Sequence, residues 1–135
     1  MKKLLLMLML LFTISINTYG AEVYIYKTTG FAIKQVVNGR WTNWSDWQES
    51  DMYVTINFDT DVVKIFSPET QVYKITEYVR KYTDESDGQQ IEFRFIDQDG
   101  DRGSMRLRIE RNGNSQIYIE FSDIMWVYNI RRVQQ

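Results

Sequence analysis

Apolar and polar residues alternate with a period of two along most of the chain. In segment 52–58, Met52, Val54, Ile56 and Phe58 share one face of an extended chain, and the residues between them are mainly polar. The same alternation recurs in three later segments: 91–97, 104–110 and 117–121. One apolar and one polar face is typical of strands in an antiparallel sheet that packs on a core.

Turn-forming residues separate these segments. Asn38-Gly39 is a strong hairpin signal, because both central residues of a type I′ turn need a positive φ. Polar breaks with aspartate, asparagine or glycine occur at further points, and Pro68 interrupts another apolar stretch. The pattern predicts ten strands: 21–28, 31–37, 40–47, 52–58, 62–67, 71–82, 90–97, 103–111, 115–121 and 124–132.

The short connections favour pairing between strands that are consecutive in the sequence. No segment of ten or more residues has the period of a helix. We therefore predict an all-β fold: a single small antiparallel meander barrel, or a strongly curved sheet, of about 8–10 short strands. Closure favours the barrel because it removes exposed strand edges. A two-sheet β-sandwich is the alternative.

The first residues have the layout of a secretory signal peptide. Lys2 and Lys3 precede an apolar run over 4–14, and the small residues Thr18 and Gly20 precede Ala21. The run is too short for a spanning helix, which needs about 20 residues. We predict a cleaved signal peptide over 1–20, a single all-β domain over 21–135, and a soluble periplasmic or secreted protein with no membrane insertion after cleavage.

The chain contains no cysteine and no histidine. This composition excludes Ser-His and Cys-His nucleophile pairs, zinc sites built from these residues, and disulfides. Loss of Lys2 and Lys3 would take the formal net charge from −2 to −4, which gives no general attraction for nucleic acid. We expect no catalytic residues, no cofactor, no metal and no nucleic-acid partner.

Three tryptophans lie three residues apart in the segment 40–47. Trp41, Trp44 and Trp47, with Arg40, predict a ligand-binding surface on which a sugar or an aromatic ligand stacks, with Asp46 as a further polar contact. The alternative is structural, with the rings plugging a barrel end or forming cross-strand pairs. Burial of aromatic area is the commoner use and favours the structural interpretation.

The acidic segment 97–103 resembles the start of a calcium loop but departs from that pattern. Arg102 occupies the position that requires glycine, and Arg108 occupies the position of the bidentate glutamate. We therefore predict a hairpin loop here. The other acidic residues form no pair that the sequence singles out for catalysis.

Three stretches resemble a known group of proteins: 39–75, FIDQDGDRGSMRLRI (95–109) and IYIEFSDIMWVYNI (117–130). They are similar to small exported all-β proteins of unknown function from Gram-negative gut anaerobes and their phages. The resemblance implies a single exported β domain and supplies no activity, ligand or site residue.

These observations predict a non-enzymatic exported binding or interaction module of the cell envelope. Its partner would be an envelope protein, a glycan or a small apolar ligand, since a barrel of about eight strands has room for one small molecule. The first alternative is an inhibitor of an envelope enzyme. The second is a carboxylate-dependent hydrolase, which would require two converging carboxyl groups, one with a raised pKa.

Overall fold

The computed structural model describes residues 23–110 and 114–133, and the predicted signal peptide over 1–20 lies outside them. Within these ranges every regular element is a strand, and no helix long and apolar enough to cross a membrane is present. The strands are β1 (Val23–Val37), β2 (Arg40–Trp41), β3 (Gln48–Glu49), β4 (Tyr53–Asn57), β5 (Val62–Ile65), β6 (Gln71–Thr83), β7 (Gln89–Asp97), β8 (Arg102–Ile109), β9 (Asn114–Glu120) and β10 (Ile124–Arg132).

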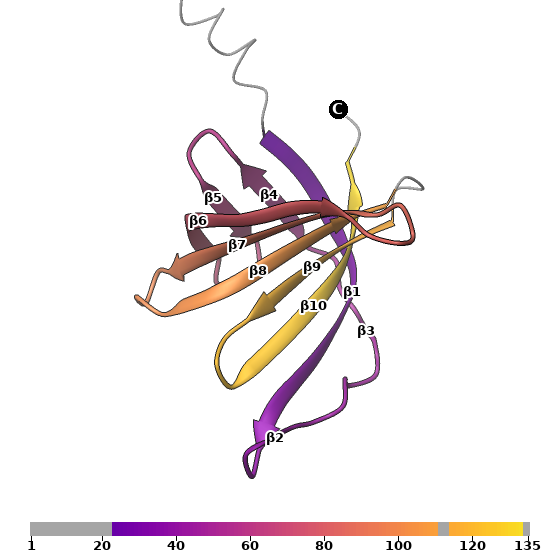
Figure 1. Cartoon of the computed structure of the whole chain (residues 1–135), viewed down its shortest axis with the longest axis vertical. Coiled ribbons are helices and arrows are strands. Elements are labelled where there is room, and N and C mark those ends of the chain that lie inside the picture. The colour runs from indigo at the N-terminus through magenta and orange to yellow at the C-terminus, as the bar shows by residue number, and fades with distance from the viewer. Residues whose placement is uncertain (1–22, 111–113, 134–135) are drawn as a thin grey trace, which may run out of the picture.

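Eight of these strands close into an antiparallel barrel (Figure 1). From β4 to β10 each strand pairs with the next along the chain, and β1 pairs with both β4 and β10 to complete the circle. The two short strands β2 and β3 attach to β1 outside this circle. The predicted small meander barrel is confirmed, and the sandwich alternative is wrong because the first and last strands join.

The strand β1 replaces two predicted strands, 21–28 and 31–37. Residues 23–27 pair with β4 on one side of β1, and residues 26–35 pair with β10 on the other side. The register with β10 shifts between Thr28 and Gly30. Thr29-Gly30 resembles a turn in sequence, but here it forms a bulge that bends one continuous strand around the barrel. A Cβ on Gly30 would lie 3.2 Å from the carbonyl oxygen of Gln48, so glycine allows β3 to approach closely.

The predicted strand over 40–47 is wrong for most of its length. Only Arg40–Trp41 and Gln48–Glu49 pair as strands, and the residues between them follow β1 irregularly. The predicted hairpin turn before this segment is confirmed, since Asn38 and Gly39 both have positive φ values of 52° and 77°. The chain therefore turns as predicted, but after Trp41 it no longer pairs regularly with β1.

The barrel interior is filled by alternate residues of the surrounding strands. Val54 and Ile56 are completely buried, and Met52 and Phe58 pack partly buried against the core, which confirms the inward face predicted for the segment 52–58. The cluster is Tyr26, Val54, Ile56, Val63, Ile65, Tyr73, Ile75, Phe93, Phe95, Met105, Leu107, Ile117, Ile119, Tyr128 and Ile130. This core leaves one end of the barrel less completely filled, and that end holds the candidate site.

Candidate functional site

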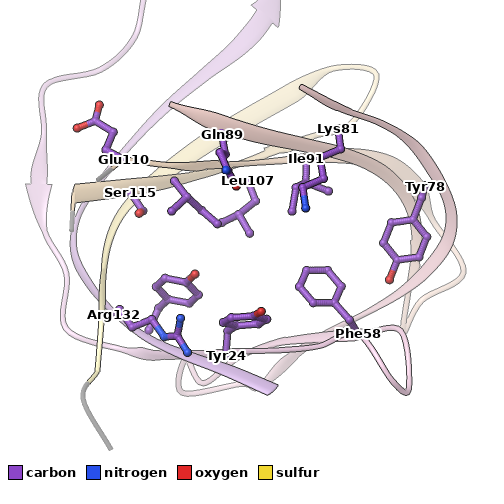
Figure 2. A pocket seen from close by; sticks show the side chains of 12 residues that line it. Tyr24, Phe58, Tyr78, Lys81, Gln89, Ile91, Leu107, Glu110, Ser115 and Arg132 are labelled. Carbon is purple, nitrogen blue, oxygen red and sulfur yellow. The ribbon is translucent and has the colours of Figure 1, made fainter. Parts of the chain in front are cut away.

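A cavity of about 630 Å³ opens at the end of the barrel where β1 begins and β10 ends (Figure 2). Side chains from seven parts of the chain reach it, because the strand ends converge there. The lining residues are Tyr24, Tyr26, Phe58, Tyr78, Lys81, Gln89, Ile91, Leu107, Ile109, Glu110, Ser115 and Arg132. The sequence analysis assigned none of them to a site.

Aromatic rings form one wall of this cavity and aliphatic side chains form the other. Phe58 lies between two tyrosines, with ring centroids 5.7 Å from Tyr24 and 6.2 Å from Tyr78. Figure 2 shows Tyr24 and Phe58 facing Ile91 and Leu107 across the opening. An apolar ligand entering this space would contact carbon on both sides.

The polar groups of the mouth carry an excess of positive charge. Lys81 and Arg132 lie on opposite sides of the cavity (Figure 2), and the Arg132 guanidinium carbon is 4.5 Å from the centroid of Tyr24. Glu110 points away from the centre and forms an ion pair with Arg108. None of the ion pairs between described residues uses Lys81 or Arg132. An anionic group would therefore meet two cations here.

Irregular pairing along β6 explains why the cavity could not be read from the sequence. Residues three apart on a regular strand point to opposite faces, yet Tyr78 and Lys81 both line the cavity. The register between β6 and β7 shifts twice, between Ile75 and Glu77 and between Tyr78 and Arg80. The second bulge returns Lys81 to the inner side, where simple alternation after Tyr78 would place it outside.

The floor of the cavity includes a buried tyrosine. Tyr26 is 2% exposed, and its burial raises the pKa of its phenol, while the nearby Arg132 acts in the opposite direction. The phenol therefore stays neutral at physiological pH. A neutral phenol supplies both a hydrogen-bond donor and an acceptor to a ligand atom that reaches it.

The predicted ligand-binding residues lie elsewhere, on the hairpin that projects from the other end of the barrel (Figure 1). Arg40 is exposed, and Trp41, Trp44 and Trp47 are 42%, 38% and 53% exposed. The rings do not plug the barrel, because they are exposed to solvent, whereas the alternative of cross-strand contacts stays open. Ligand binding at these residues stays a prediction.

The exposed tryptophans are nevertheless in contact with neighbouring side chains. The Lys34 ammonium lies 4.8 Å from the centroid of Trp44 and 5.6 Å from that of Trp41. Trp44 makes an edge contact with Tyr118 at 6.3 Å, and the Arg106 guanidinium covers Tyr118 at 4.0 Å. A row of rings, with a cation at each end, thus crosses the outer face from Lys34 of β1 to Arg106 of β8.

The best-connected carboxyl group, Asp84, has the wrong pKa for a general acid. Burial of Asp84 raises its pKa, but hydrogen bonds from the Gly88 N–H, the Gln90 amide, the Arg108 guanidinium and the Ser86 N–H outweigh this effect and hold it at about 2. A hydrolase of the kind considered above needs one carboxyl with a raised pKa. Asp84 instead anchors its loop to the barrel.

The acidic segment 97–103 contains the predicted hairpin loop, residues 98–101, between the last residue of β7 and the first of β8. The Asp97 carboxylate accepts hydrogen bonds from the N–H groups of Asp99 at 2.9 Å and Asp101 at 2.8 Å, which fixes the turn. Across the two described ranges, no group of three or more acidic side chains is placed to hold a metal ion.

Comparison with protein-family models, with curated proteins and with solved structures finds no match.

Proposed function

We propose that this protein is a non-enzymatic binding module of the cell envelope, periplasmic or secreted, that holds one small amphiphilic molecule with an anionic end. The observation that carries the proposal is the cavity of about 630 Å³ at the barrel mouth, with its aromatic and aliphatic walls. Small-molecule sites commonly have volumes of about 300–1,000 Å³ and apolar linings with a few polar groups. The proposed location rests on the signal peptide predicted over 1–20.

The charge of the mouth supports an anionic end on the ligand. Lys81 and Arg132 flank the opening. Glu110, the one acidic side chain among the described residues of the lining, is engaged by Arg108. A carboxylate between the two cations would gain charge-assisted hydrogen bonds, which contribute about 1.5–3 kcal/mol each. A cationic head group would be repelled by the same pair. The apolar remainder of the ligand would occupy the space between Phe58 and Ile91.

Competition for a reporter fluorophore tests this proposal with residues 21–135. N-phenyl-1-naphthylamine, which is neutral and apolar, reports occupancy, and decanoate, decanol and decyltrimethylammonium compete for it. We expect decanoate to displace the reporter about tenfold more effectively than the cation does, because of the charge-assisted contacts. Equal displacement by all three would contradict the anionic end but leave an apolar site.

Two pairs of variants locate the binding. Ile91→Trp places an indole in the cavity and should abolish reporter binding, whereas Val79→Trp adds the same ring at an exposed position of β6 and should not. Lys81→Gln should weaken decanoate about tenfold relative to decanol, while Lys64→Gln on the exposed face of β5 should not. Melting curves confirm folding of each variant. Failure of the folded protein to bind the reporter, or unchanged binding in Ile91→Trp, would overturn the proposal.

A further inference from the structure

The proposed ligand of the barrel cavity does not involve the tryptophan hairpin, which consists of the end of β1, β2 and the irregular segment up to β3. Among the four tryptophans of the chain, three are exposed within a span of seven residues: Trp41, Trp44 and Trp47. Figure 1 shows the tip of this hairpin, at β2, projecting away from the barrel at the end opposite the start of β1, and the chain then returning along β1 to β3. Exposed aromatic groups gathered in one place commonly mark a binding surface, while scattered ones need no explanation.

The three rings are exposed but are held in place. Lys34 lies against both Trp41 and Trp44, and Tyr118 contacts the edge of Trp44. The Trp47 ring lies over Gly30, where a Cβ would come within 3.6 Å of it. Rings that are already ordered lose little conformational entropy when a ligand covers them, so the surface is prepared for binding.

The backbone that carries the rings is fixed by side-chain hydroxyls instead of a regular ladder. Ser45 Oγ accepts a hydrogen bond from the Ile33 N–H at 2.9 Å, and Thr42 Oγ1 accepts one from the Gln35 N–H at 3.1 Å. The N–H groups of Ser45 and Thr42 in turn donate to the carbonyls of Ile33 and Gln35 at 2.8 Å. These four bonds direct the hydroxyls toward β1 and leave the intervening side chains toward solvent.

Polar side chains with unused hydrogen-bonding groups stand between the rings. Arg40, Asn43 and Asp46 are exposed, and within the described ranges their side chains take part in no hydrogen bond or ion pair. Together with Lys34, which lies against two of the rings, they provide two cations, one anion and one neutral amide, so the local charge is small. An anionic lipid surface or a nucleic acid requires a cluster of basic residues, which this hairpin lacks.

We propose that Trp41, Trp44 and Trp47 form a saccharide-binding surface, independent of the barrel cavity. A pyranose ring carries a flat patch of C–H bonds on one face, and these partial positive charges fit the negative face of an indole. Its hydroxyl groups both donate and accept hydrogen bonds, which matches Arg40, Asn43 and Asp46. The chemical class is a neutral oligosaccharide, whose successive rings would stack on successive tryptophans.

Titration of residues 21–135 with neutral tetrasaccharides tests this inference. The probes are the β-1,4-linked tetramers of N-acetylglucosamine and of glucose and the α-1,4-linked tetramer of glucose. We expect at least one to change the tryptophan fluorescence and to protect it from acrylamide. Trp41→Ala and Trp44→Ala should each weaken that binding about tenfold or more, as aromatic anchors do, whereas Tyr53→Ala, which removes an equally exposed ring from β4, should not.

Three outcomes would overturn the inference. The first is that no tetrasaccharide perturbs the fluorescence of protein whose melting curve shows it to be folded. The second is that binding survives both tryptophan substitutions. The third is that vesicles of anionic phospholipid bind through the same tryptophans when the saccharides do not, which would make the hairpin a lipid-surface contact. The cavity variant Ile91→Trp should retain saccharide binding, so the two proposals fail separately.

Discussion

At the scale of single residues, Asp84 shows how a loop is attached to the outer face of the barrel. Its carboxylate accepts a hydrogen bond from Arg108 Nε at 2.9 Å and another from the Gln90 amide at 2.9 Å. It also accepts hydrogen bonds from the N–H groups of Ser86 and Gly88. Arg108 is also paired with Glu110, so one guanidinium joins the loop to β8.

The lowered pKa of Asp84 predicts a specific dependence of stability on pH. The group has an ordinary pKa of 3.8 and a folded-state pKa of about 2, so ionised Asp84 stabilises the fold above pH 3.8. This contribution should be lost as the pH falls from about 4 to about 2. Asp84→Asn should be less stable than the parent protein at neutral pH and should lack this part of the acid dependence.

Denaturant unfolding of both proteins at a series of pH values measures the effect. Asp59→Asn serves as the control, because Asp59 lies exposed in the turn between β4 and β5 and forms none of the ion pairs between described residues. If the free energies of unfolding of the parent protein and Asp84→Asn changed in parallel between pH 4 and pH 2, the stabilising role of ionised Asp84 would be contradicted.

At the scale of elements, the bulge in β1 decides how the barrel and the hairpin are joined. Thr28 is 2% exposed, its hydroxyl accepts a hydrogen bond from the Met52 N–H at 2.8 Å, and it bonds the Ser50 hydroxyl at 2.8 Å. This buried side chain fastens the end of the irregular segment to the bend in β1. The segment before β4 therefore enters the barrel at a fixed position.

Replacement of Thr28 by valine should destabilise the protein although the side-chain shape is kept. The Met52 N–H would lose its acceptor, and a buried donor without a partner costs about 1–3 kcal/mol. Thr29→Val is the matched control, because Thr29 is exposed and its hydroxyl makes only a long contact with the Asn129 carbonyl at 3.5 Å.

Denaturant unfolding gives the stability difference, and amide hydrogen exchange of Met52 reports the lost bond directly. Equal stability of Thr28→Val and Thr29→Val, with Met52 still protected, would contradict this account.

At the scale of the whole molecule, closure of the barrel depends on residues distant in sequence. Thr29 and Asn129, which are 100 residues apart, lie in contact where β1 meets β10. This pairing must form between the two ends of the folded domain. Bringing residues so distant in sequence together lowers the entropy of the chain before the contacts between β1 and β10 can stabilise the fold.

Such a topology predicts slow folding. Barrels dominated by non-local strand pairs fold in milliseconds to seconds, and we expect the same for residues 21–135. Stopped-flow refolding followed by tryptophan fluorescence measures the rate. Complete refolding in microseconds would show that the closing pair between β1 and β10 does not limit the reaction.

The sequence by itself determined the class of fold and most of the strands from β4 to β10. Period-two alternation places Val54 and Ile56 inside, and this inward face needs no tertiary information because side chains of a strand alternate by geometry. The Asn38-Gly39 turn follows equally from local chemistry, since few other residues adopt positive φ at low cost. Together these local rules predicted an all-β meander.

Tertiary structure decided where the pattern is interrupted and what the interruptions create. The bulges in β6 bring Tyr78 and Lys81 to the same cavity, and the hydroxyls of Thr42 and Ser45 turn the predicted strand over 40–47 into an exposed surface. Both the bulges and the hydroxyl hydrogen bonds form with a neighbouring strand, so the pattern of a single segment does not predict them. The physical reason is that register and closure are properties of pairs of strands, whereas alternation is a property of one.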